Sequence, residues 1–205
     1  MVSDRMKTAY DRVAGQFAQR YDSMTPVLET FAAAFLEQLP EHPEILDAGC
    51  GRGRDMAWFE QHGGIVTGID LSPEMIALAR TRTTGQLREM DLLELEFEAE
   101  SFDKIWSNAA LLHIPKSQTV DVLHQFQILL KPNGVLALGL HHGDFEGRES
   151  GTYTDTERYF SRFKEPELKS LLASSEFTVT SMDTHEGAPR TWIHALARVR
   201  SDSVT

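Results

Sequence analysis

The chain has 205 residues, with 20 Lys and Arg against 31 Asp and Glu, which gives a formal net charge of −11. Hydrophobic residues make up 41% and charged residues 25%. These fractions exclude a largely disordered chain and indicate a single globular domain, residues 1–205. The acidic excess repels the phosphate backbones of DNA and RNA, so we expect no nucleic-acid partner.

The sequence also limits the compartment and the metal chemistry. Cys50 is the single cysteine, which excludes an intrachain disulfide and a cysteine-ligated metal cluster. The N-terminal segment lacks the apolar centre of a secretory signal, and no apolar run reaches the ~20 residues of a membrane span. We therefore expect a cytoplasmic protein, monomer or homodimer, with no membrane contact and no metal.

Two helices are predicted before the first strand. Residues 4–21 place apolar and aromatic side chains at helical spacing. Pro26 suits the first turn of a second helix, whose apolar face ends before Pro40.

From residue 41 to residue 200, short β-rich runs alternate with helical patterns. This alternation is typical of βαβ units and a mainly parallel sheet. Strands are predicted at 44–48, 65–70, 86–90, 102–108, 135–140, 177–182 and 192–199, and a polar, glycine-rich loop at 141–156. The fold class is therefore α/β, a three-layer α/β/α sandwich with a seven-stranded sheet.

The segment Asp47-Ala48-Gly49-Cys50-Gly51-Arg52-Gly53 joins the first predicted strand to a helix. Alternating glycines let the backbone turn sharply and approach a ligand closely. The free N–H groups of the following helix start can also face that ligand. We interpret this segment as a ligand-binding loop.

Carboxylates end the next two predicted strands. Asp70 lies 21 residues after Gly49, where a carboxylate can accept hydrogen bonds from both ribose hydroxyls of an adenosine ligand. Asp91 ends the third strand in the same way. The loop spacing is G-x-G-x-G rather than the dinucleotide pattern G-x-G-x-x-G. Asp47 is also better suited to an ammonium than to a pyrophosphate.

Five segments in order resemble the motifs of the class I S-adenosylmethionine (SAM)-dependent methyltransferases. They are ILDAGCGRGRD at 45–55, VTGIDLSPEMI at 66–76, MDL at 90–92, FDKIWSNAALLHI at 102–114 and LLKPNGVLAL at 129–138. The match extends over roughly residues 8–199. It implies the strand order 3-2-1-4-5-7-6 with strand seven antiparallel, SAM as cofactor and S-adenosylhomocysteine as product.

The resemblance also assigns cofactor contacts. The methionine part of SAM is expected near Asp47, the loop residues Gly49, Cys50 and Gly51, and Asn108; the ribose at Asp70; and the adenine at Leu71, Met75, Asp91 and Leu92. Arg52 departs from the family pattern, and either contacts the SAM carboxylate or points to solvent. In similar enzymes the N-terminal helices, here residues 1–40, form part of a lid, and Tyr21 then reaches the SAM carboxylate.

The substrate side is less distinct in the sequence. His113 is a candidate general base, because it follows the fourth strand. His141 follows the fifth strand, Tyr10 belongs to the N-terminal helix, and Arg158 or Arg162 is placed to hold an anionic group. Each of these residues also has a plain packing or surface interpretation.

Methyl transfer from a sulfonium is an in-line displacement that depends mainly on alignment, so a fixed catalytic residue is not required. The sequence after the fourth strand, Ser107-Asn108-Ala109-Ala110, lacks the Asn/Asp-Pro-Pro-Tyr/Phe motif of nucleic-acid amino methyltransferases. We therefore expect a small-molecule acceptor. A protein methyltransferase, a non-catalytic SAM-binding module and an NAD(P)-dependent oxidoreductase remain as alternatives.

Overall fold

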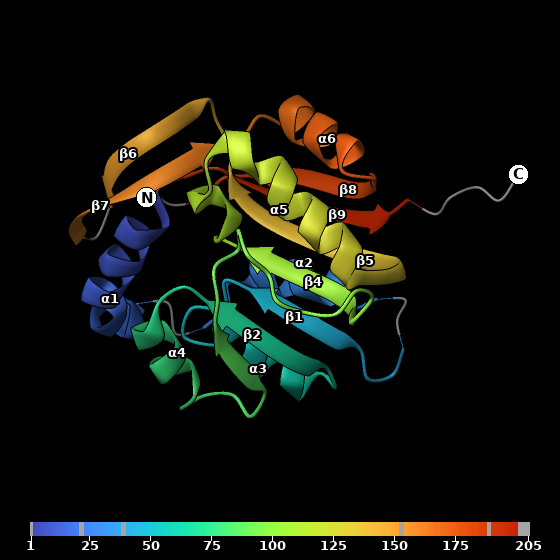
Figure 1. The fold of residues 1–205 in the computed structure, drawn as a ribbon, viewed down its shortest axis with the longest axis horizontal. Helices are drawn as coiled ribbons and strands as arrows, with labels where there is room; N and C mark the ends of the chain where they lie inside the picture. The colour runs from blue at the N-terminus through green and yellow to red at the C-terminus, as the bar shows by residue number, and fades with distance from the viewer. Residues whose placement is uncertain (1, 21–22, 38–39, 152–153, 188–189, 201–205) are drawn as a thin grey trace, which may run out of the picture.

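The computed structural model describes residues 2–20, 23–37, 40–151, 154–187 and 190–200. A seven-stranded sheet of order β3-β2-β1-β4-β5-β9-β8 forms its centre (Figure 1). The strands are β1 Glu44–Ala48, β2 Ile65–Asp70, β3 Gln86–Glu89, β4 Phe102–Asn108, β5 Leu130–His141, β8 Phe177–His185 and β9 Trp192–Val199. The first five are parallel, and β9 is antiparallel to both neighbours. The predicted α/β class and strand order are confirmed.

Helices cover both faces of this sheet (Figure 1). The helices α2 Pro26–Leu36, α3 Arg54–Gln61 and α4 Pro73–Ala79 contribute to one hydrophobic cluster. The helices α5 Lys116–Leu129 and α6 Glu165–Ser174 contribute to the other. None of the helices in the described part of the chain is long and apolar enough to cross a membrane.

Side chains alternate between the two clusters along each central strand. Ile45 and Trp106 pack with the cluster of α2 and α3, whereas Leu46 and Ile105 pack with the cluster of α5. All four are fully buried. Burial on both faces fixes the register of the parallel strands, because a slip of one residue would exchange the two sets.

Capping side chains determine where two helices begin. The Ser72 hydroxyl accepts a hydrogen bond from Met75 N at 3.2 Å, and Pro73 occupies the first turn of α4. The Thr25 hydroxyl accepts one from Leu28 N at 3.3 Å at the start of α2. The start of α4 therefore lies directly after Asp70, the last residue of β2.

The predicted loop at 141–156 is wrong. Strands β6 Phe145–Gly151 and β7 Thr154–Arg162 form an antiparallel hairpin there, outside the central sheet. The hairpin packs against α1, Val2–Arg20, which also contacts α4 (Figure 1). The positions on one side of β6 include Phe145, Gly147 and Glu149, so the sequence shows no apolar alternation.

The fifth strand also begins earlier than predicted, at Leu130 rather than residue 135. Its first residue pairs with Phe102, and the register then shifts before the Lys104–Val135 pair. Asn133 has a φ of 65° within this irregular stretch. Residues 131–134, which precede the predicted strand, therefore form a bulge inside β5.

Lys104 on β4 gives the protein a distinct pH response. Its side chain is fully buried, and Nζ lies 3.3 Å from the Glu37 carbonyl oxygen and 4.6 Å from the centre of the Phe35 ring. Burial and then the positive charge of Arg198 lower the pKa of Lys104 to about 7. Between pH 7 and pH 10 the unfolded chain keeps this proton and the folded chain loses it, so the free energy of unfolding rises with pH.

We expect Lys104→Met to remove that rise, because the variant has no amine to titrate. Thermal or urea unfolding at pH 7, 8 and 9 measures it, with Lys169→Met on the exposed surface of α6 as the matched control. An unchanged pH slope in Lys104→Met would show that the amine is not desolvated in the folded chain.

Candidate cofactor and acceptor site

Functional side chains meet at one edge of the sheet because parallel strands end there together. Asp70, Asn108 and His141 are the last residues of β2, β4 and β5. Strand β9 runs in the opposite direction, so its first residue, Trp192, lies at the same edge and pairs with His141. These residues line a cavity of about 580 Å³, a size typical of small-molecule sites.

The glycine loop closes tightly over the end of β2. Gly49 N and Cys50 N both donate to the Ile69 carbonyl, at 2.9 and 2.8 Å. Gly49 has a φ of +93°, and a Cβ there would lie 2.1 Å from the Ala110 Cβ. Gly51 has a φ of +52° and open space where its side chain would be. Glycine is therefore required at position 49, where the loop comes close to Ala110. At Gly51 the backbone of the loop is open.

Asp70 connects this loop to the start of α4. One carboxylate oxygen accepts from Gly51 N and the other from Ser72 N, each at 2.9 Å. Burial raises the pKa of Asp70 to about 6, and these backbone hydrogen bonds limit the rise. Because a carboxylate has about four acceptor positions, Asp70 keeps capacity for hydroxyl donors in the cavity.

Asp47 and Asp55 form a second acidic group behind the loop. Asp47 is 2% exposed, and its Oδ2 has no hydrogen-bond partner within the described residues. Burial, and then the charge of Asp55, raise the pKa of Asp47 well above its usual value. A buried carboxyl with an unused oxygen suits a cationic ligand, which would replace the lost solvation.

Sequence reasoning assigned no role to Asp55, the last residue of the motif at 45–55. The Asp55 carboxylate accepts from Arg54 Nε at 2.6 Å, Trp106 Nε1 at 2.9 Å and Asn108 Nδ2 at 3.2 Å. Asp55 therefore orients Asn108 at the cavity wall. The position of Asp55, two residues after Gly53 at the end of the glycine loop, was the signal in the sequence that could have indicated this role.

The predicted adenine-side residues all line the cavity. They are Leu71, Met75, Asp91 and Leu92. Asp91 Oδ1 accepts from Leu93 N at 3.0 Å, which fixes the turn after β3. Met90 and Leu93 join this wall as well, so this part of the cavity is mainly apolar, with one carboxylate.

The remaining cofactor-side predictions have separate outcomes. Cys50 and Arg52 line the cavity and are buried, so the solvent-facing alternative for Arg52 is wrong. Burial also raises the pKa of the Cys50 thiol well above its usual value, which leaves it neutral and suited to packing. Tyr21 lies outside the described residues.

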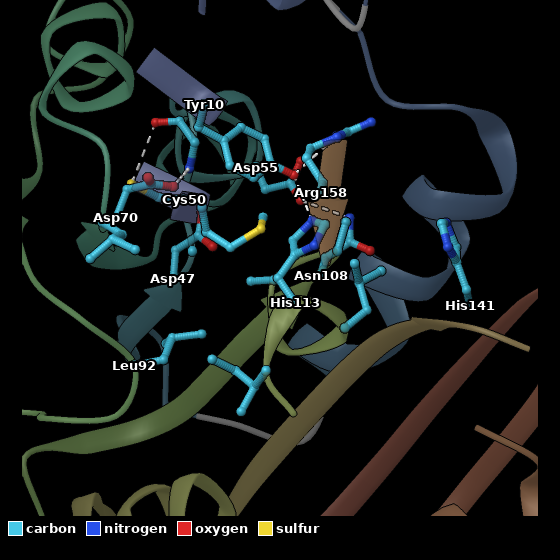
Figure 2. A pocket seen from close by; sticks show the side chains of 18 of the residues that line it. Tyr10, Asp47, Cys50, Asp55, Asp70, Leu92, Asn108, His113, His141 and Arg158 are labelled. Atoms are coloured by element: carbon cyan, nitrogen blue, oxygen red, sulfur yellow. Dashed lines mark hydrogen bonds between the residues drawn. The ribbon is translucent and has the colours of Figure 1, made fainter. Parts of the chain in front are cut away.

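At the other end of the cavity, His113 and Tyr10 form a buried network with Arg158 (Figure 2). His113 Nδ1 lies 2.6 Å from the Tyr159 carbonyl oxygen, and Nε2 lies 2.6 Å from the Tyr10 hydroxyl. A carbonyl only accepts, so Nδ1 carries the proton and Nε2 accepts from Tyr10. Arg158 Nη1 donates to the same hydroxyl at 3.3 Å.

This geometry opposes the predicted base role of His113. Both ring nitrogens have partners within the protein, and burial lowers the pKa of His113 to about 3. An imidazole of such low basicity takes up a proton poorly at neutral pH. Its contacts instead hold Tyr10 in place.

Aromatic rings surround this end of the cavity. His141 stacks on Phe160 at 5.8 Å between centres and meets Trp192 edge-on at 4.5 Å. His194 stacks on Phe31 at 4.2 Å. Of the rings in these three pairs, only that of His141 was predicted from the sequence to lie at this site. The antiparallel direction of the last strand, which was also predicted, was the signal that would have placed Trp192 and His194 at this edge.

Arg162 does not join this group in the structure. Its guanidinium pairs with Glu149 across the hairpin and lies 4.5 Å from the centre of the Phe145 ring. The lining of the cavity includes Arg158 and not Arg162. Residues 158 and 162 of β7 therefore differ in role, which their spacing alone did not reveal.

The comparisons with known proteins agree with this geometry. The family described as "Methyltransferase domain" matches residues 45–134. The 1,6-didemethyltoxoflavin-N1-methyltransferase of Burkholderia thailandensis, solved with its substrate and S-adenosylhomocysteine, superimposes with a TM-score of 0.76. It is 25% identical, with 97% of this chain and 88% of that chain covered. In its family match and in its fold the chain is similar to the SAM-dependent methyltransferases.

Two curated relatives add to this assignment. The malonyl-(acyl-carrier protein) O-methyltransferase of Enterobacter lignolyticus is 29% identical over 77% of this chain and 64% of its own length. The ubiquinone biosynthesis O-methyltransferase of Histophilus somni is 33% identical over 45% of this chain and 42% of its own length. The chain thus spans less than two thirds of the length of these relatives. SAM is the cofactor of the family, and the oxidoreductase alternative has no support here.

We expect Gly49→Ala to abolish SAM binding and to lower stability by about 1–3 kcal/mol, because the new Cβ collides with Ala110 and the positive φ is strained. Titration calorimetry and thermal unfolding measure both effects. Gly15→Ala in α1 is the matched control, because its Cβ meets no atom within 4 Å. Tight SAM binding by Gly49→Ala would contradict the close approach.

We also expect SAM binding to release protons at mildly acidic pH, because a bound ammonium beside Asp47 lowers the raised pKa of that carboxyl. Calorimetry in buffers of different ionisation enthalpy counts the protons. The Asp47→Asn variant should bind more weakly and lose this part of the release. Equal release from wild type and variant would show that Asp47 does not face the ammonium.

Proposed function

We propose that this protein transfers a methyl group from SAM to a small-molecule acceptor. The observation that carries the proposal is the junction of Asp70 with the glycine loop: its carboxylate accepts from Gly51 N and Ser72 N and faces the cavity. The similarity to methyltransferases supports the reaction type. The full activity, the acceptor and any partner of this chain are part of the proposal.

The residues present fit SAM. All three line the cavity, and in this proposal Asp70 binds the ribose hydroxyls, Asp47 the ammonium and buried Arg52 the carboxylate of the methionine part. When bound, SAM supplies an activated methyl group on a positive sulfur. The chain's task is then to align the acceptor and to exclude water.

The walls of the cavity favour a small acceptor over a protein. The N-terminal helix α1 contributes Met6 and Tyr10, and the hairpin contributes Arg158 and Phe160. Both lie across the carboxyl edge of the sheet, in keeping with the predicted lid (Figure 1). The relatives are named for different acceptors and for both oxygen and nitrogen methylation, so the family alone leaves the acceptor open.

Titration with SAM and S-adenosylhomocysteine, with NADH as a negative control, tests the cofactor assignment. We expect micromolar or tighter binding of the first two. Asp70→Ala should weaken it roughly 10–100-fold, since charge-assisted hydrogen bonds to the ribose are lost. Wild-type affinity should also fall as the pH drops below about 6, the pKa of Asp70, because a protonated carboxyl accepts fewer hydrogen bonds.

The matched control is Asp121→Ala on the exposed face of α5, which should leave SAM affinity unchanged. Incubation with methyl-labelled SAM and either a small-molecule extract or a protein extract then locates the acceptor. Label in protein would favour the protein-methyltransferase alternative. Binding without any transfer would favour a non-catalytic module.

A further inference from the structure

The cavity is electrostatically divided along its length. The cofactor end carries Asp47, Asp55, Asp70 and Asp91 together with Arg52 and Arg54. The other end carries Arg158 and Arg190, four histidines and Glu186. Figure 2 shows Asp47 and Asp70 on one side, with Arg158 and His141 toward the other. A chain with a net charge of −11 thus places a basic region where the acceptor would bind.

Arg158 is the most buried cation of this region. It is 9% exposed, whereas the side chain of Arg190 is 37% exposed and pairs with Glu149 at 3.0 Å. The Arg158 guanidinium lies 5.6 Å from the centre of the Tyr10 ring and 5.2 Å from that of Phe160. A guanidinium held between aromatic rings is weakly hydrated and ready to bind a planar anion.

Neighbouring contacts hold Arg158 rather than assist a proton transfer. Tyr10 accepts from Arg158 and donates to His113 Nε2, and His113 donates to the Tyr159 carbonyl. This network joins α1 to β7 and to the segment after β4. Tyr10 and His113 therefore act as positioning residues for Arg158.

Three of the four histidines that line the acceptor end are weak bases. His113 has both nitrogens occupied, and burial lowers its pKa to about 3. Burial likewise lowers the pKa of His141 and of His194 to about 4 each. An alcohol or phenol acceptor would have to lose a proton during transfer, whereas a carboxylate is already ionised at neutral pH.

We propose that the acceptor is a carboxylate, bound by Arg158 and methylated on oxygen to give a methyl ester. This inference rests on the proposed function. A carboxylate oxygen uses a lone pair to form the new O–CH₃ bond, while the C–S bond breaks and its electron pair stays on sulfur. The negative carboxylate and the positive sulfonium become two neutral products, so no proton moves and no base is needed.

The chemistry of the product tests the inference. Methyl-tritiated SAM is incubated with the protein and a small-molecule extract of the cells that produce it, and the products are treated with dilute hydroxide. Methyl esters release volatile labelled methanol, whereas methyl ethers and methyl amines do not. We expect most of the transferred label to become volatile; label that withstands hydroxide would overturn the carboxylate assignment.

Variants test the role of Arg158. Arg158→Gln should raise the KM for the labelled acceptor fraction roughly 10–100-fold and leave the Kd of SAM within about twofold. Arg158→Lys should retain part of the activity. Arg148→Gln, on the exposed face of the same hairpin, is the matched control and should behave as wild type. Arg52→Gln should show the opposite pattern, with weaker SAM binding.

The outcomes separate the two proposals. Loss of SAM affinity in Arg158→Gln would place Arg158 in the cofactor site and overturn the inference, while the methyltransferase proposal stands. Unchanged acceptor kinetics in Arg158→Gln would also overturn it. Failure of the wild-type protein to bind SAM or to transfer label to any small molecule would instead contradict the proposed function itself.

Discussion

Buried carboxylates at the ends of β1 and β2 impose the main physical constraint on this fold. An isolated charge in a protein interior costs several kcal/mol, so each carboxylate needs hydrogen-bond donors or a positive partner. Asp70 obtains two backbone N–H groups because the glycine loop and the start of α4 both turn toward it. Within the part of the chain that the structure describes, one Asp47 oxygen has no hydrogen-bond partner, so a cationic cofactor suits this place.

The opposite end of the cavity is built from elements outside the seven-stranded sheet. Helix α1 and the β6–β7 hairpin bring Tyr10 and Arg158 together across 148 residues of sequence, and His113 fixes the pair from the segment after β4. The same sheet edge therefore serves two tasks. Its acidic side suits the positive cofactor, and its added elements supply aromatic rings and a positive charge for the acceptor.

Sequence reasoning succeeded where the signal is local. The alternation of strands and helices and the spacing of Gly49 and Gly51 both depend on neighbouring residues, and they identified the glycine loop at the carboxyl edge of the sheet. The hairpin was missed because Gly147 and Glu149 interrupt any apolar alternation in β6.

The different roles of Arg158 and Arg162 also could not be predicted. They depend on Glu149, which pairs with Arg162 across the hairpin, and such a pairing cannot be recognised before the hairpin itself is known. His113 was given a base role because its partners, Tyr10 and the Tyr159 carbonyl, come from distant segments.

A crystal structure of the protein with S-adenosylhomocysteine would show whether the cavity is divided in this way. We expect both ribose hydroxyls within hydrogen-bond distance of the Asp70 carboxylate, the ammonium beside Asp47, and the sulfur directed toward the end of the cavity that holds Arg158. S-adenosylhomocysteine bound away from Asp70, or with its amino-acid part against Arg158, would contradict the division of the cavity into an acidic cofactor end and a basic acceptor end.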